Sequence, residues 1–263
     1  MLLSLFMNLG YSQRTETNFN NDWRFILEDH PSYSKEEIDQ SLWTTLNIPH
    51  DWSFEKGVRK GGDQGQGGGY HDGGIGWYRK QFNVHKESLS KITYINFDGV
   101  YMNSEVWING NHLGKRPYGY ISFRYDISTY LKEGKNTIAV RVDNSLEPSA
   151  RWYHPCGIYA QVKLIEVNKT HIKPNGVFVT TPKIENDKAL VFVETQFEGD
   201  LKNLKYVVQL YSASGDLLSS AQKKIKFSKE KLFLIVETPS LWSPETPNIY
   251  KAVTQILEGK KVI

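Results

Sequence analysis

The sequence has a single cysteine, almost no excess of charge and no long apolar run after its first residues. One thiol, Cys156, excludes an intrachain disulfide and a zinc site built from several thiolates. The 32 basic and 29 acidic residues are spread along the chain, which is not the pattern of a nucleic-acid-binding protein. No later segment approaches the roughly 20 apolar residues of a membrane span. Dense Asp/Asn ligand spacing is also missing, so we predict no metal, no cofactor and no membrane partner.

The first thirteen residues are apolar and then turn polar. This pattern is typical of the apolar core and end of a secretory signal, although the positively charged start of such a signal is missing. We therefore interpret residues 1–13 as the remnant of a signal peptide, which predicts a periplasmic or secreted protein. The alternative is a frayed apolar terminus.

Helical patterns are scarce, and strand patterns recur at intervals of about ten residues. A capping box at Ser34–Glu37 predicts one short helix toward Leu42. Asn109-Gly110 predicts a tight turn between two strands. Many short strands at this spacing predict an all-β sandwich or barrel. The clearest strand patterns cover Trp77–Val84, Lys91–Asp98, Ser104–Ile108, Asn136–Val142 and Gln161–Val167.

A polar segment with Pro174 and Gly176 interrupts the strands after Val167. We therefore divide the chain into residues 14–170 and residues 171–263. The second part has four or five strand patterns, which is typical of an immunoglobulin-like sandwich. Its last strand stops at Ile263, so we expect this sandwich to be incomplete.

Glycine is concentrated in one stretch, because nine of the 21 glycines lie between Gly61 and Gly76. Such a stretch is either a surface shaped by positive-φ residues or a flexible linker, and the residues alone leave both open. A phosphate cradle is disfavoured, because neither Gly-Lys-Ser/Thr nor the start of a helix follows.

Aromatic residues make up 13% of the chain, and chains of this kind often bind sugars through ring faces. His50-Asp51-Trp52 is a candidate binding trio, because a carboxylate bonds sugar hydroxyls and an indole stacks on the sugar ring. The alternative is a structural turn with a buried tryptophan. We interpret Cys156 as a small buried residue and His154 as a histidine in a surface loop.

Several motifs in order resemble the amino-terminal domain of glycoside hydrolase family 2, in particular its β-galactosidase-like branch. They are Ile48–Trp52, Gly74–Lys80, Phe97–Val100, Ser104–Gly110, Arg151–Tyr153 and Gly157–Tyr159. Leu241–Tyr250 is similar to the end of the second, immunoglobulin-like domain of that family.

The resemblance implies a jelly-roll sugar-binding domain followed by a truncated immunoglobulin-like domain. In the family a catalytic (β/α)₈ barrel with two glutamates comes next, beyond Ile263, and such a pair is what a retaining glycosidase needs. The chain alone is therefore predicted to be inactive, with a β-glycoside as the partner of the whole enzyme. The first domain would line the active-site rim with the loop of Arg151 and Trp152, and it would contribute contacts of a homo-oligomer.

One departure from the family pattern is Arg151, since the familiar galactosidases and glucuronidases have an acidic residue in this column, which helps to bind substrate or sodium. An arginine only donates, so a sodium site is in doubt. Two other classes stay open: a stand-alone carbohydrate-binding module, and a structural adhesin-like protein, which the motif order disfavours. Fold alone does not decide between them.

Overall fold

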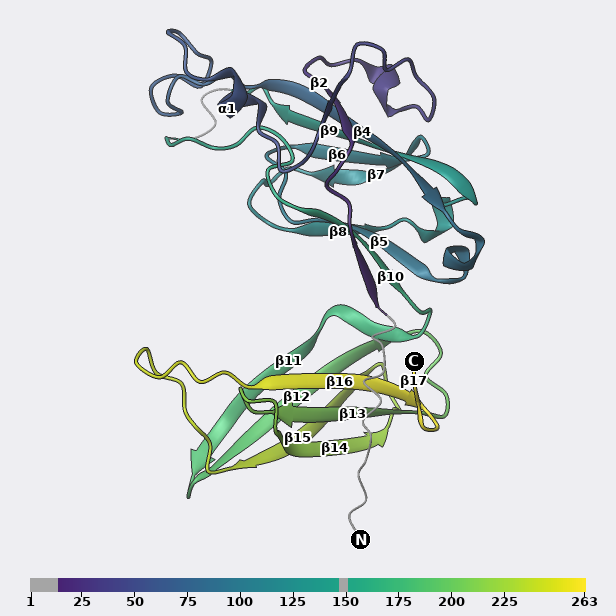
Figure 1. Ribbon diagram of the computed structural model, residues 1–263, viewed down its shortest axis with the longest axis vertical. Helices are drawn as coiled ribbons and strands as arrows, with labels where there is room; N and C mark the ends of the chain where they lie inside the picture. Colours follow the sequence, from purple (N-terminus) through teal and green to yellow (C-terminus); the bar gives the residue numbers. More distant parts are fainter. Residues whose placement is uncertain (1–13, 147–150) are drawn as a thin grey trace. The chain divides into compact units, whose positions relative to one another are not determined.

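The computed structural model describes residues 14–146 and 151–263, so the predicted signal remnant 1–13 lies outside the described residues. The chain divides into two compact domains, Arg14–Glu166 and Val167–Ile263. Each contains two β-sheets and its own hydrophobic core, so the all-β prediction is confirmed (Figure 1). Within the described ranges, no helix is long and apolar enough to cross a membrane.

The first domain is a sandwich of a four-stranded and a six-stranded sheet. The smaller sheet has the order β1 (Thr15–Asn18), β10 (Val162–Val167), β5 (Ile92–Phe97) and β8 (Phe123–Asp126). The larger sheet has the antiparallel order β3 (Thr44–Leu46), β2 (Trp23–Ile26), β4 (Gly74–Val84), β9 (Gly134–Asn144), β6 (Ser104–Ile108) and β7 (Asn111–Arg116). Four short helices interrupt the strands: η1 (Pro31–Ser34), α1 (Trp52–Lys56), η2 (Lys86–Ser90) and η3 (Ser128–Tyr130).

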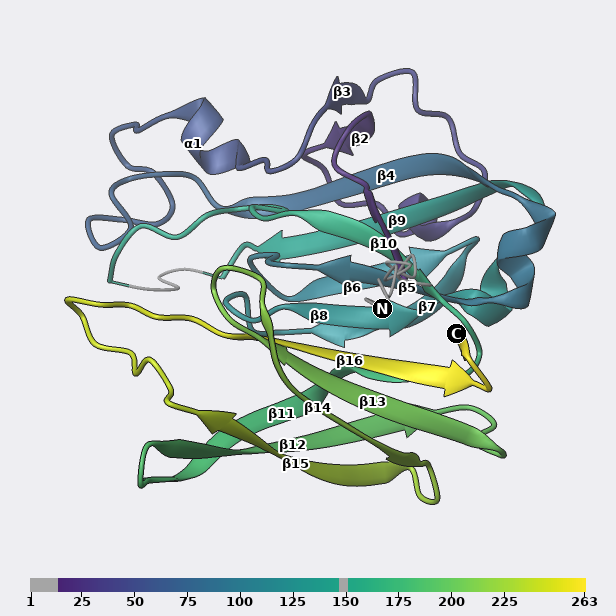
Figure 2. The ribbon, with the colours of Figure 1, turned by 60° about the horizontal axis from the view of Figure 1, so that its bottom comes forward.

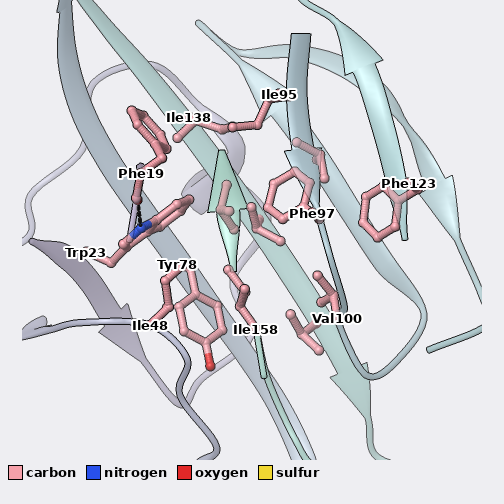
Figure 3. Packing of buried hydrophobic residues seen from close by; sticks show 14 of the residues in the cluster. Phe19, Trp23, Ile48, Tyr78, Ile95, Phe97, Val100, Phe123, Ile138 and Ile158 are labelled. Atoms are coloured by element: carbon pink, nitrogen blue, oxygen red, sulfur yellow. Dashed lines mark hydrogen bonds between the residues drawn. The ribbon is translucent and has the colours of Figure 1, made fainter. Parts of the chain in front are cut away.

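Strand β4 is a central strand of the larger sheet and pairs with β9 along its whole length. Its neighbouring residues Trp77 and Tyr78 point to opposite faces, and both are buried. Tyr78 faces the core between the sheets, where Trp23 also lies and donates its indole N–H to the Phe19 carbonyl at 2.8 Å (Figure 3). Trp77 faces outward and stacks on Trp107. The larger sheet is therefore covered on both faces.

The predicted hairpin is confirmed, since Asn109 and Gly110 both have positive φ between β6 and β7. The predicted helix from Ser34 toward Leu42 is wrong: the segment forms only η1 and bends. The reason is tertiary. The guanidinium of Arg79, buried beneath this segment, donates hydrogen bonds to the carbonyls of Tyr33 (2.5 Å), Lys35 (2.7 Å) and Glu36 (2.8 Å).

Replacing Arg79 by methionine should destabilise the first domain by about 3 kcal/mol, because three carbonyls would lose their buried, charged donor. Burial lowers the pKa of Arg79 to about 10, so the side chain is still a cation at neutral pH. Urea unfolding followed by tryptophan fluorescence measures the change. Arg24→Met, at an exposed position on the neighbouring strand β2, is the control. Equal midpoints for the two variants would contradict the anchoring role.

The second domain is a sandwich of three and four antiparallel strands (Figure 2). One sheet has the order β11 (His171–Glu185), β12 (Lys188–Glu198) and β15 (Lys229–Glu237). The other has the order β14 (Leu217–Lys224), β13 (Leu204–Tyr211), β16 (Lys251–Glu258) and β17 (Lys261–Val262). This is the predicted immunoglobulin-like sandwich. Its last strand, β17, pairs with β16 at Leu257 and Glu258.

Candidate functional site

Asp51 caps the helix α1, which lies with the following glycine-rich loop at one end of the first domain (Figures 1 and 2). Its Oδ1 accepts hydrogen bonds from the backbone N–H groups of Ser53 (3.0 Å) and Phe54 (3.3 Å) and from the Ser53 hydroxyl (2.7 Å). The same oxygen accepts the backbone N–H of Cys156 at 3.0 Å. Asp51 thus accepts hydrogen bonds from the first backbone N–H groups of the helix, and it joins the helix to a segment about a hundred residues later in the chain.

Trp52 lies in the core and is only 2% exposed. Its ring stacks on Phe25 with the ring centroids 5.8 Å apart, and its indole N–H donates to the Gly73 carbonyl at 3.1 Å. The expectation that Trp52 stacks on a sugar is wrong, because its ring is buried and already packs against Phe25. The structure instead matches the alternative of a structural turn with a buried tryptophan.

The glycine-rich loop, residues 59–73, is folded on itself rather than extended. Backbone hydrogen bonds close it repeatedly, among them Tyr70 N–H to the Gly65 carbonyl at 2.8 Å and Gln64 N–H to the His71 carbonyl at 3.0 Å. A Cβ on Gly62 would lie 2.0 Å from the Tyr70 carbonyl oxygen, so this close approach requires glycine. Of the two interpretations of the stretch, the structure favours the shaped surface.

The segment 151–158 packs against both α1 and the glycine-rich loop. Cys156 is fully buried and accepts hydrogen bonds at its sulfur from Asn144 (2.8 Å) and Gln64 (3.3 Å). Burial raises the pKa of the Cys156 thiol to about 11, so it is not a nucleophile at neutral pH. The prediction of a buried cysteine is confirmed.

His154 was expected in a surface loop, and this expectation is wrong. The imidazole is 0% exposed and stacks on Tyr101 with centroids 4.6 Å apart, and its Nδ1 lies 3.3 Å from the Asn144 amide. Burial lowers the pKa of His154, which favours the neutral ring. The histidine therefore packs on the buried side of the segment 151–158 and does not face solvent.

Tyr153 is held at its hydroxyl and at its ring. The hydroxyl donates to Asp51 Oδ2 and lies 3.4 Å from the Ser53 hydroxyl. The ring meets His71 edge to face with centroids 4.8 Å apart. Partial burial raises the pKa of Tyr153, so the phenol keeps its proton and donates to the carboxylate.

Exposed rings gather beside this segment. Trp152 is 62% exposed, and its indole N–H lies 3.4 Å from the Tyr120 hydroxyl. Tyr120 contacts Tyr118 and the buried Tyr101, with centroids 5.8 and 5.1 Å apart. We call Tyr118, Tyr120 and Trp152 the aromatic surface. Sugars bind proteins through such exposed ring faces together with a few polar groups.

The four predicted site residues therefore have different surroundings. Arg151 and Trp152 are exposed, Asp51 is partly buried, and Trp52 is buried. Sequence reasoning missed Tyr118, Tyr120, Tyr153 and His71. The signal that could have found the first two was Tyr-Gly-Tyr at Tyr118–Tyr120, two aromatics around a glycine in a segment without strand alternation.

The described parts of the chain contain no group of three or more His, Cys, Asp or Glu side chains that could hold a metal ion. In the second domain, a hollow of about 290 Å³ lies beside the segment 239–250. Its lining is mostly apolar and includes Val179, Ile184, Leu241, Trp242 and Tyr250. No titratable cluster converges there, so it does not compete as a catalytic site.

Comparison with known proteins assigns both domains. The sugar-binding domain of glycosyl hydrolases family 2 matches residues 70–168, and a second domain described as glycosyl hydrolases family 2 matches residues 170–263. A Formosa agariphila protein named "Putative beta-glucuronidase" is 68% identical, over 96% of this chain and 24% of its own length. Beta-galactosidase BoGH2A of Bacteroides ovatus is 40% identical, over 95% of this chain and 30% of its own length.

A solved structure agrees with these matches. The crystal structure of a β-glycosidase from Bacteroides vulgatus superposes with a TM-score of 0.88 at 39% identity, covering 94% of this chain and 32% of that one. The chain thus spans about a quarter to a third of the length of these relatives. The described residues form two β-sandwiches and contain no (β/α)₈ barrel. The chain belongs to glycosyl hydrolase family 2, and it comprises the family's sugar-binding domain and the immunoglobulin-like domain that follows it.

Proposed function

We propose that this chain is the non-catalytic front of a β-glycosidase and that loops of its first domain line the rim of the active site. The aromatic surface carries the proposal, because it places exposed rings beside Arg151 at the loop end of the sugar-binding domain. The exposed rings would stack on a sugar, and the guanidinium would donate hydrogen bonds to its oxygens. The hydrolysis itself would belong to another part of the enzyme.

For the substrate we propose a β-glucuronide, with a β-galactoside as the alternative. Arg151 supplies a fixed positive charge, which suits the carboxylate of a uronic acid better than a neutral sugar. The 68% identical relative is named "Putative beta-glucuronidase", whereas the 40% identical relative is named as a β-galactosidase.

A stand-alone carbohydrate-binding module is the second candidate function. The exposure of Trp152 and Tyr118 favours it, since rings that project from a sandwich can bind glycans without any catalytic domain. The two candidates differ in affinity. If the first domain only lines the rim of an active site, it contacts a sugar from one side. We then expect binding no tighter than about millimolar, or roughly −4 kcal/mol.

The chain should bind p-nitrophenyl β-D-glucuronide weakly and release no nitrophenol above buffer. Trp152→Ala should weaken binding about fivefold, the size of one lost stacking contact. NMR titration measures the affinity, and absorbance measures hydrolysis. Trp242→Ala is a matched control, because Trp242 is also 62% exposed but lies in the second domain.

Three outcomes would contradict the proposal in different ways. Turnover that survives a contaminant control would place chemistry in this chain. Micromolar binding lost in Trp152→Ala and Arg151→Ala would favour the stand-alone module. Equal losses of affinity in Trp152→Ala and Trp242→Ala would show that the aromatic surface has no specific role in binding.

The cellular location remains a separate proposal. We propose that the enzyme is periplasmic or secreted, on the basis of the apolar residues 1–13. We also propose that the full-length enzyme forms a homo-oligomer, on the basis of the family resemblance. Mass spectrometry of the mature amino terminus and light scattering of the full-length enzyme test the two points.

A further inference from the structure

Two separate segments of the first domain converge on Tyr153, the residue next to the exposed Trp152 in the chain. Asp51 precedes α1, His71 closes the glycine-rich loop, and Tyr153 lies about a hundred residues later. Asp51 Oδ2 accepts the Tyr153 hydroxyl, while the His71 ring lies against the Tyr153 ring. Tyr153 is therefore held at its hydroxyl and at its ring, although the residue is 39% exposed.

The supports of Tyr153 are themselves tied together. His71 Nδ1 lies 2.9 Å from the Ser53 carbonyl, within hydrogen-bond distance, and Asp51 Oδ1 accepts the Ser53 N–H and hydroxyl. The backbones also pair: the N–H of Trp52 donates to the Cys156 carbonyl at 3.1 Å. Asp51 is therefore occupied by protein donors on both carboxylate oxygens, and His71 faces Tyr153 and Ser53.

The glycine-rich loop adds one more connection. Gln64, which is 1% exposed, reaches from this loop to the sulfur of Cys156. The compact turns of the loop are what bring Gln64 and His71 to the same segment. Its glycines thus allow the loop to fold into a support for this segment.

We propose that Asp51 and His71 are positioning residues, which fix Tyr153 and thereby the direction in which Trp152 faces a carbohydrate, and that the glycine-rich loop is their support. The inference rests on the proposed function of the aromatic surface. It reassigns Asp51, expected from the sequence to bond sugar hydroxyls, to a role through Tyr153.

The test measures the indole N–H of Trp152 by NMR relaxation in the ligand-free chain, with its signal assigned by its loss in Trp152→Phe. In the unchanged chain we expect an order parameter of about 0.85, and in Asp51→Ser a fall toward about 0.6. Serine still caps a helix but lacks the second oxygen to which Tyr153 donates. Affinity for p-nitrophenyl β-D-glucuronide should fall about fivefold in the same variant.

Tyr153→Phe is the second variant, because it keeps the ring contact with His71 and removes only the hydroxyl. At the Trp152 indole it should reproduce the effect of Asp51→Ser, and the double variant should add nothing further to that readout, since both variants remove the hydrogen bond from Tyr153 to Asp51 Oδ2. Asp126→Ser is the matched control. Asp126 likewise accepts the N–H of a serine two residues later, at 2.9 Å, and that serine's hydroxyl, but it is the last residue of β8, away from Tyr153.

The outcomes separate this inference from the proposed function. An indole that is already mobile in the unchanged chain, or unaffected by Asp51→Ser and Tyr153→Phe, overturns the inference. A loss of affinity with an unchanged order parameter also overturns it, because Asp51 would then contact the sugar directly. If the unchanged chain binds no glycoside, the proposed function fails, while the ligand-free measurement still decides the positioning role. If Asp51→Ser does not fold, Tyr153→Phe decides alone.

Discussion

Gly157→Ala should lower the unfolding free energy of the first domain by about 3 kcal/mol, which is about 10 °C in melting temperature. The backbone at Gly157 has φ of +133°, a conformation that L side chains rarely adopt. A Cβ would lie 2.3 Å from the Tyr78 hydroxyl and 2.7 Å from the His50 carbonyl oxygen. Backbone strain and overpacking each cost about 1–2 kcal/mol, so we expect them to add.

The neighbours of Gly157 cannot move aside cheaply. Its N–H and carbonyl both pair with Tyr101 across an isolated bridge, and the Tyr78 hydroxyl lies 2.6 Å from His50 Nδ1. Gly134→Ala is the control, because Gly134 also has positive φ but no atom within 4 Å of the added Cβ. It should cost only the backbone part, about 1 kcal/mol. Equal melting temperatures for the two variants would show that the site relaxes around the methyl group.

The strands of this protein could be predicted because their signals are local. Alternating residues and the Asn109-Gly110 turn specify β6 and β7 without help from distant parts of the chain. The Ser34–Glu37 helix failed for the opposite reason. Its capping box is a real local preference, but buried Arg79, more than forty residues later, binds the carbonyls of this segment.

The candidate site was predicted only in part, because its residues depend on contacts across about a hundred positions. Sequence could single out Asp51 and Trp152, but it could not show that Asp51 accepts from Tyr153. The burial of His154 could not be predicted for the same reason. Its neighbours Tyr153 and Pro155 suggest a surface loop, yet the ring is buried because Tyr101 stacks on it. Motif resemblance identified the family, whereas roles of single side chains needed the folded arrangement.

Acidification from pH 6.5 downward should destabilise the first domain well before its carboxylates titrate, because two of its histidines are buried. His50 is 5% exposed and His154 is 0% exposed. Burial lowers the pKa of both, although Glu55 and Asp51 oppose the shift at His50, and Asp51 and nearby backbone groups oppose it at His154. In the unfolded chain both rings would titrate near the ordinary value of about 6.5.

The sign follows from proton binding. Above pH 6.5 neither state binds these protons, so this contribution to stability is fully present. Below it the unfolded chain binds protons that the folded domain excludes, so stability falls by up to about 1.4 kcal/mol per pH unit for each histidine. The loss continues until pH reaches the lowered pKa values of the folded domain.

Urea unfolding at intervals between pH 7.5 and 5 measures this slope. Tryptophan fluorescence is a suitable signal, because six of the seven tryptophans lie in the first domain. Replacing His154 by glutamine should reduce the slope by up to half, since one buried titration is removed, whereas His85→Gln at an exposed position is the control. A flat stability between pH 6.5 and 5.5 would mean that the folded domain accepts both protons, with Glu55 pairing to a charged His50.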